Sequence, residues 1–337
     1  MKERIFSLAS KIVSLFPISW ETERKISNIA NLVYLTFKNG HKYTFRHQAI
    51  LDISSDFFEN YLCRSDLNEK IVRLKRNLDE RSQLVIDMII KRHRYIYTHN
   101  LLDNKEIYNR EELKKQNIVK SFWKKRRNYF PICDYPETYF YHNGLKILPN
   151  DIIKKISGKD AIDGGGFVGD SAIIFSREYS FRKIYSFEPD KFNFAKLERN
   201  ISKYKMNNVE PVNKGISSRE GRVNFNIQGV SSSIQSQGKD EIEVATIDEY
   251  TNSQKLSANI GLIKLDVEGA EFDAITGSIK TIEKFRPVLL ISIYHTGKDF
   301  FEIKPLLESL NLGYKFKIRK INPNSPIGEV MLIAYVA

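Results

Sequence analysis

The chain has 337 residues, of which 42% are hydrophobic and 28% are charged, a composition typical of a globular protein with a buried core. Its two cysteines, Cys63 and Cys133, exclude a disulfide framework and favour a reducing compartment, and no apolar run is long enough to cross a bilayer. Residues 1–135 carry most of the net charge of +12, with 26 Lys and Arg against 16 Asp and Glu. Such an excess favours anionic partners: a membrane surface, an acidic glycan or nucleic acid.

Residues 1–135 are therefore predicted to form a basic, mainly helical region that contacts substrate, a membrane or a second copy of the chain. Met1–Phe16 has apolar residues at helical spacing, which predicts a helix packed on the protein itself, with a membrane-surface helix as the alternative. Asn39-Gly40 predicts a hairpin between Leu32–Phe37 and Lys42–Phe45.

From Asp52 to about His99 the pattern is helical. Two basic clusters, Lys91–Arg94 and Lys124–Arg127, are predicted to be solvated helix faces, with docking to an anionic acceptor or membrane as the alternative. Nothing in the region resembles a nucleic-acid-binding module, so nucleic acid is not an expected partner. The predicted core positions are Leu74, Leu78, Leu84, Val85, Met88 and Ile89.

Pro131 and Pro136 predict a boundary, with a second domain over residues 136–337. Asn143-Gly144 predicts a hairpin between Tyr139–Tyr141 and Leu145–Leu148. Strands and helices then alternate, which predicts a parallel sheet, while the last two strands have no helix between them and should pair antiparallel at its edge. One predicted strand ends at Asp163. The others cover Lys183–Phe187, Val209–Asn213, Arg222–Ile227, Ile242–Thr246, Asn259–Leu265, Pro287–Ile293, Tyr314–Ile318 and Glu329–Val336.

The stretch from Lys159 to Asp190 predicts a strand, a glycine turn, a helix and a second strand, which is a βαβ unit for a nucleoside-bearing cofactor. Asp170 or Ser171 is expected to cap the helix. The turn contains Gly164, Gly165, Gly166 and Gly169, where positive φ and close backbone approach favour glycine.

Two acidic residues bear on the identity of that cofactor. Asp163 precedes the first glycine, where a carboxylate would repel the pyrophosphate of NAD but suit the ammonium of S-adenosylmethionine (SAM). Glu188, at the end of the second strand, can accept both ribose hydroxyls in either case. The stretch favours SAM, with NAD or a turn that binds nothing as the alternatives.

Five ionisable side chains are expected at strand ends on one rim of the sheet: Asp163, Glu188, Asp266, Glu268 and His295. Methyl transfer to a hydroxyl requires removal of a proton, for which Asp266 and His295 are the best-placed candidates. Lys264 is expected to be an ion-pair partner of these acids or a support for the acceptor oxygen. A divalent metal between Asp266, Glu268 and His295 is chemically reasonable, but the sequence favours no metal.

The polar loop Gly229–Gly238, with Ser231-Ser232-Ser233, is either a lid near the cofactor or a flexible connection.

The segments AIDGGGFVGDS, YSFEPD, VATIDEY, LIKLDVEGAE and PVLLISIYH occur in this order, and together they resemble the FkbM family of SAM-dependent methyltransferases from about Tyr139 to Ala337. The resemblance implies a class I methyltransferase fold, a Rossmann-like α/β seven-stranded sheet with an antiparallel last strand. It also implies a cofactor site, in which Glu188 and Pro189 border the ribose, Gly215 and Ile216 the adenine, and Asp266 to Gly269 both donor and acceptor. The methionine part of SAM would lie against Asp163, Gly164, Gly165, Gly166, Phe167, Gly169, Asp170 and Ser171.

The predicted function is therefore a cytoplasmic O-methyltransferase that uses SAM to methylate a hydroxyl of a sugar, polysaccharide or glycan precursor. The candidate catalytic residues are Asp266, His295, Lys264 and Glu268. The alternatives are methylation of another small molecule or of nucleic acid, a NAD-dependent oxidoreductase, and a non-catalytic nucleotide-binding module. The basic region could bring the protein to the inner face of a membrane, and the oligomeric state is left open.

Overall fold

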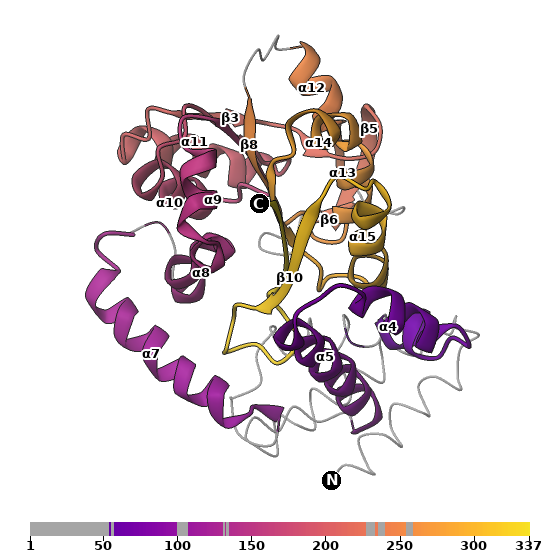
Figure 1. Cartoon of the computed structure of the whole chain (residues 1–337). Coiled ribbons are helices and arrows are strands. Elements are labelled where there is room, and N and C mark those ends of the chain that lie inside the picture. Colours follow the sequence, from indigo (N-terminus) through magenta and orange to yellow (C-terminus); the bar gives the residue numbers. More distant parts are fainter. Residues whose placement is uncertain are drawn as a thin grey trace, which may run out of the picture.

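A seven-stranded sheet forms the centre of the part of the chain that the computed structural model describes, in the order β10-β11-β9-β8-β1-β2-β3 (Figure 1). The described residues are 54, 57–99, 107–130, 132, 135–226, 233–234, 240–253 and 259–337. The strands of this sheet are β1 (Asp160–Gly164), β2 (Ile184–Phe187), β3 (Val209–Val212), β8 (Ile260–Leu265), β9 (Val288–Ser292), β10 (Tyr314–Lys320) and β11 (Val330–Val336).

The strand directions confirm the predicted sheet. β1, β2, β3, β8 and β9 run parallel, whereas β11 pairs antiparallel with both β9 and β10. Because β10 and β11 follow each other without a helix, they form a hairpin, which places β10 at the edge. The sheet is thus the seven-stranded sheet with a reversed last strand that the family resemblance implies.

Helices cover both faces of the sheet, and alternate residues of each strand face opposite cores. In β8, Leu262 belongs to the same core as Phe175 of the helices on one face, while Ile263 and Leu265 belong to the core that contains Phe300 on the other. The first layer contains α8 (Pro136–Tyr141), α9 (Asn150–Ile156), α10 (Asp170–Glu178) and α11 (Lys191–Lys203), and the second α12 (Ile247–Ser253), α13 (Glu271–Thr276), α14 (Ile279–Phe285) and α15 (Gly297–Ser309) (Figure 1).

Helices from the first 135 residues pack on the same sheet. Helix α4 (Leu67–Lys75) lies against α15, and α5 (Glu80–His99) lies along the edge strand β10 (Figure 1). The Ser82 hydroxyl accepts a hydrogen bond from the Ile318 N–H at 2.9 Å, so α5 covers part of the edge that β10 would otherwise expose. The proposed division at residue 135 stays a prediction.

The positions expected in the core of this helical region were largely correct. Leu74, Leu78 and Ile89 are buried and Val85 and Met88 pack against the core, but Leu84 is 60% exposed. The other helix of the region, α7 (Arg110–Arg126), runs along the side of the molecule and packs on α8, where the rings of Trp123 and Tyr139 stack at 5.2 Å (Figure 1).

The prediction of a solvated face at Lys91–Arg94 was wrong for half of the cluster. Arg92 and His93 are buried. The Arg92 guanidinium pairs with the carboxylate of Glu112, in the first turn of α7, and His93 stacks on Phe57 at 4.0 Å. By contrast, Lys124–Arg127 is exposed, as expected.

The hairpin expected at Tyr139–Leu148 was also wrong. Asn143 and Gly144 do have positive φ, as a hairpin turn requires, but α8 precedes them and a 3-10 helix, η2 (His142–Ile147), contains them. A small second sheet is formed by β4 (Gly215–Ile216), β7 (Asp240–Ala245), β5 (Gly221–Asn226) and β6 (Ser233–Ile234). Strands β5 and β7 were predicted from the sequence, but the sequence did not show that they belong to a separate sheet.

Several sequence predictions fall outside the described residues. These are the Met1–Phe16 helix, the hairpin around Asn39-Gly40 and most of the loop Gly229–Gly238. Among the helices of the described residues, none has the length and apolar content needed to span a membrane.

Candidate functional site

The glycine turn follows β1 directly. Gly165 has φ +76°, and a Cβ there would lie 1.8 Å from the carbonyl oxygen of Asp266, so only glycine fits. The N–H groups of Gly165 and Gly166 donate to the Phe187 carbonyl at 3.1 and 2.8 Å. The turn is therefore tied to the ends of β2 and β8, the two strands beside β1.

Helix α10 leaves this turn without a side-chain cap. Gly169, with φ +96°, occupies the N-cap position, and Asp170 is the first helical residue. The expectation that Asp170 or Ser171 caps the helix was wrong, because the Ser171 hydroxyl instead donates to the Asp163 carboxylate at 2.6 Å.

Asp163 is fully buried and surrounded by polar partners. Its Oδ2 accepts hydrogen bonds from the hydroxyls of Ser171 at 2.6 Å and Ser186 at 3.0 Å. Its Oδ1 lies 3.1 Å from the Lys264 ammonium, in an ion pair that does not align as a hydrogen bond, so Oδ1 keeps an unused acceptor position.

Lys264 lies behind the turn as the ion-pair partner of Asp163, the first of the two roles expected for it. Its ammonium also donates to the Gly165 carbonyl at 2.8 Å. Burial by itself would lower the pKa of Lys264, but Asp163, Asp266 and Asp170 outweigh burial and raise that pKa. The side chain is a fixed buried cation that orients the turn.

Glu188, at the end of β2, is buried and held by the backbone. Its two oxygens accept the N–H groups of Phe167 at 2.8 Å and Asp190 at 2.9 Å. Burial raises the pKa of the Glu188 carboxyl to about 8, against the lowering effect of these N–H groups. Each oxygen retains a lone pair for a further donor, as the binding of two ribose hydroxyls requires.

The expected adenine-binding residues lie beside the same turn. Gly215 and Ile216 form β4, and a Cβ on Gly164 would lie 2.8 Å from the Ile216 side chain. Ile132 and Tyr135, from the segment after α7, also border the turn: Ile132 lies near Gly169, and the ring of Tyr135 is 6.4 Å from that of Phe167.

A second cluster begins where β8 ends, next to the turn. Asp266 joins the two, because its N–H donates to the Gly164 carbonyl at 3.0 Å. His295 Nε2 lies 3.7 Å from Asp266 Oδ1 and 3.4 Å from Glu268 Oε2. We call Asp266, Glu268 and His295 the acidic cluster. The tertiary structure thus brings together three of the predicted catalytic residues, whereas the fourth, Lys264, pairs with Asp163.

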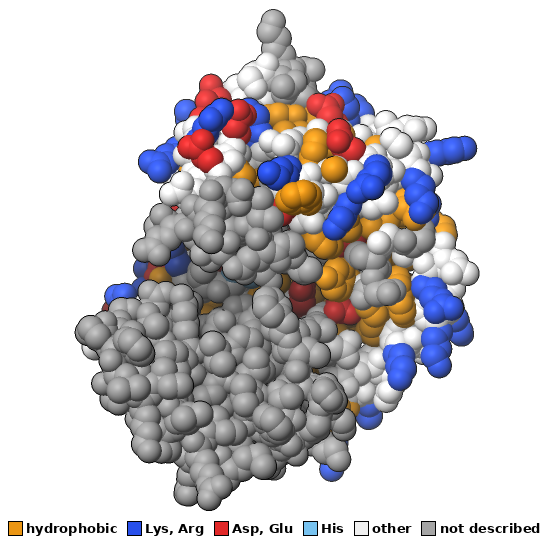
Figure 2. Space-filling view, turned by 180° about the vertical axis from the view of Figure 1, so that it is seen from behind, with side chains coloured by type: hydrophobic (Ala, Val, Ile, Leu, Met, Phe, Trp, Pro, Cys, Tyr) orange, Lys and Arg blue, Asp and Glu red, His pale blue; other side chains and the backbone are white. Residues whose placement is uncertain are grey.

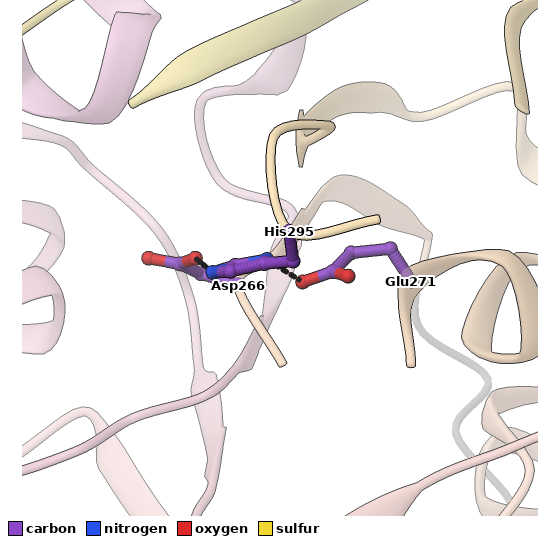
Figure 3. A group of neighbouring side chains, drawn as sticks. All are labelled: Asp266, Glu271 and His295. Atoms are coloured by element: carbon purple, nitrogen blue, oxygen red, sulfur yellow. Dashed lines mark hydrogen bonds and ion pairs between the residues drawn. The ribbon is translucent and has the colours of Figure 1, made fainter. Parts of the chain in front are cut away.

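The sequence reasoning missed the role of Glu271 beside this cluster. Figure 3 shows the His295 imidazole lying between the carboxylates of Asp266 and Glu271. His295 Nδ1 and Glu271 Oε1 are 2.9 Å apart, and the two oxygens of Glu271 also accept the N–H groups of Val267 at 2.7 Å and Gly269 at 3.0 Å. A signal existed in the sequence, since Glu271 follows a glycine loop at the start of a helix, where a carboxylate can bind free N–H groups.

Carboxylates dominate the electrostatics of the acidic cluster. Burial would lower the pKa of His295, but Glu271, Glu268 and Asp266 together raise it well above its ordinary value. Burial, assisted by Asp266 and Glu271, raises the pKa of Glu268 to about 7. Glu268 and Gly269 both have positive φ, so the loop turns sharply to present these side chains.

A family model matches the part of the chain that forms this site. Residues 163–316 match the family model described as the methyltransferase FkbM domain. A search of curated proteins found no match.

One solved structure shares the fold, and others match more weakly. The methyltransferase FkbM from Methylobacillus flagellatus KT matches with TM-score 0.56 and 19% identity over 84% of this chain and 61% of its own, so this chain spans about three fifths of that protein. Aeropyrum pernix fibrillarin, solved with S-adenosyl-L-methionine, matches with TM-score 0.37 and 13% identity over 58% and 74% of the two chains. A Geobacter sulfurreducens methyltransferase matches with TM-score 0.37 and 13% identity over 74% and 98%.

Proposed function

We propose, from the premise that residues 163–316 form an FkbM methyltransferase domain, that the protein is a SAM-dependent O-methyltransferase. The observation that carries the proposal is the contact between the glycine turn and the acidic cluster. Asp266 belongs to both, because it hydrogen-bonds Gly164 through its N–H and faces His295 through its side chain. A donor held at the turn and an acceptor held at the cluster would therefore meet at Asp266.

The residues at the turn fit SAM. Asp163 Oδ1 is a buried acceptor without an aligned hydrogen-bond donor among the described residues, and an ammonium would supply one. Glu188 has acceptor positions for ribose hydroxyls, and the buried apolar side chain of Ile216 lies beside Gly164, near where the family resemblance puts the adenine. When bound, SAM supplies an electrophilic methyl group on a sulfonium.

The acidic cluster suits a hydroxyl acceptor. An alcohol is a weak acid, so its oxygen needs an acceptor for its proton as it attacks the methyl carbon. The side chains of Asp266 and Glu268 are 29% and 33% exposed, so they can contact an acceptor that enters from solvent. His295 is held by Glu271, and its Nε2 faces both carboxylates.

For the acceptor we propose a sugar, polysaccharide or glycan precursor. Its multiple hydroxyls would find hydrogen-bond acceptors in the acidic cluster. The basic end of α7, Lys124–Arg127, would help to recruit an anionic glycan or an anionic membrane surface that carries it. Figure 2 shows Lys and Arg side chains along the side of the molecule where α7 runs.

Calorimetry with S-adenosylhomocysteine tests the donor half of the proposal. We expect binding that weakens when Asp163 or Glu188 is replaced by its amide, and no binding of NADH. The acceptor half is tested by incubation with labelled SAM and an extract of host nucleotide sugars and polysaccharide, followed by mass spectrometry. Binding of NADH in place of S-adenosylhomocysteine would overturn the proposal.

A further inference from the structure

His295 is arranged as metal-binding histidines are. Such histidines donate one ring N–H to a carboxylate, which fixes the ring and leaves the other nitrogen free for the metal. Here Nδ1 lies 2.9 Å from Glu271 Oε1. Glu271 is itself fixed by the N–H groups of Val267 and Gly269, so it cannot turn away from the imidazole.

The other ring nitrogen points at carboxylate oxygens without bonding to them. His295 Nε2 is buried and has no hydrogen-bond partner among the described residues, and the side chain is only 6% exposed. Asp266 Oδ1 is likewise buried and without a partner. The separations of 3.7 and 3.4 Å to Asp266 and Glu268 exceed the usual hydrogen-bond range of about 2.7–3.2 Å. Two ligands on one tetrahedral ion, with bonds of about 2.05 Å, lie about 3.4 Å apart.

We propose that Asp266, Glu268 and His295 bind one divalent transition-metal ion. Ligand atoms of Asp266, His295 and Glu271 lie within 4.8 Å of one another. Because both oxygens of Glu271 already accept hydrogen bonds, Glu268 is the third ligand and Glu271 orients His295. Imidazole with carboxylates suits Mn²⁺ or Zn²⁺ better than an all-oxygen ion such as Ca²⁺. The ion also offsets the negative charge that three neighbouring carboxylates accumulate.

The role of the ion rests on the proposed function. The exposed sides of Asp266 and Glu268 leave coordination positions for an acceptor with two adjacent hydroxyls, as sugars carry. The ion lowers the pKa of the bound hydroxyl, whose proton passes to solvent. The oxygen–carbon bond then forms as the methyl–sulfur bond breaks, and the sulfur keeps the electron pair, which yields the methyl ether and S-adenosylhomocysteine.

Titration of the full chain with Mn²⁺ alone, followed by electron paramagnetic resonance, tests the site without an acceptor. We expect one bound Mn²⁺ per chain, with affinity at least tenfold lower in Asp266→Asn and in His295→Gln. Asp273→Asn is the matched control, because Asp273 is an exposed acid on the neighbouring helix α13, and it should bind Mn²⁺ within twofold of the unchanged protein.

Calorimetry with S-adenosylhomocysteine on the same samples separates the two proposals. Donor binding without Mn²⁺ binding would overturn the metal site and leave the methyltransferase proposal standing, with His295 as a cation among three carboxylates. Mn²⁺ binding without donor binding would support the metal site and overturn the methyltransferase proposal. Equal Mn²⁺ affinity in all variants would also overturn the site. If His295→Gln fails to fold, Glu268→Gln replaces it, since Glu268 is one-third exposed.

Discussion

The two halves of the site are built in opposite ways. At the glycine turn, Asp163 is neutralised by the buried Lys264, and serine hydroxyls and backbone N–H groups satisfy most of its acceptors and those of Glu188. In the acidic cluster and the adjoining Glu271, one imidazole faces three carboxylates, and Asp266 Oδ1 and His295 Nε2 are buried without a hydrogen-bond partner among the described residues. Apart from Asp163 Oδ1, the donor half is paired within the protein, whereas the acceptor half is electrostatically unbalanced.

This difference is consistent with separate roles, cofactor binding in one half and reaction with the acceptor in the other. A cofactor is the same in every turnover, so its site can be rigid and internally satisfied. The site of the reaction must accommodate charge that develops during bond formation. Buried groups without partners there destabilise the fold unless a ligand or the reaction uses them. The following predictions test whether the two halves are separable, from the largest expected effect to the smallest.

Lys264→Met should break the donor half by destabilising the fold. The change leaves Asp163 as a buried charge without its cation, and losses of this kind cost about 3–5 kcal/mol. Urea unfolding should show the loss, whereas Lys298→Met, at a half-exposed ion pair, should cost less than about 1 kcal/mol. Similar losses in both variants would show that the Asp163–Lys264 pair does not organise the turn.

His295→Gln should break only the acceptor half. Removing a group that positions the acceptor or its proton typically lowers kcat about 100- to 1,000-fold. Methyl transfer to the acceptor found in the extract assay gives kcat, and calorimetry should show S-adenosylhomocysteine affinity within about threefold of the unchanged protein. A parallel loss of donor affinity would contradict the separation of the two halves.

Glu188→Gln should weaken the donor half without affecting the acceptor half. The amide keeps the shape but loses charge and one acceptor position, so S-adenosylhomocysteine affinity should fall about tenfold, as expected for one hydrogen bond to a charged group. The control is Glu210→Gln on β3, an exposed acid paired with Lys183. Unchanged affinity in Glu188→Gln would place the ribose elsewhere.

The same variant should also change how the stability of the fold depends on pH. This effect should be smaller, because two N–H groups already stabilise the charged carboxylate of Glu188. The pKa of Glu188 is about 8 in the folded chain against 4.5 ordinarily, so the folded state binds the proton more tightly. This contribution to stability is present below pH 4.5 and is lost as the pH rises toward 8. Urea unfolding at pH 5 and pH 8 should show a shallower decline for Glu188→Gln. Identical declines would mean that Glu188 titrates normally.

Local sequence patterns predicted the position of the glycine turn and of the acids at the strand ends beside it. The glycines, Asp163 and Glu188 follow one another in a single βαβ unit, so their spacing along the chain fixes their spacing in space. Asp266 and His295 were predicted to meet because parallel strands end at one edge of a sheet. The roles of Asp266, His295 and the other candidate site residues stay predictions.

Errors arose where distant residues decided the outcome. Arg92 is buried because Glu112, twenty positions along the chain, and the carbonyl of Pro326 accept its hydrogen bonds. Asn143-Gly144 supplied the backbone conformation of a turn, but the helical segments around it pack on the sheet, and no partner strand exists there among the described residues.

The sequence by itself determined the order of strands and helices, the glycine turn and the acids at the strand ends, because these depend on backbone conformation and on neighbours in the chain. Only the tertiary structure decided that Lys264 neutralises Asp163, that Glu271 fixes His295, and that Nε2 is left facing Asp266 and Glu268. Those relations depend on distances of a few ångströms between separate strands and loops, which spacing along a chain does not specify.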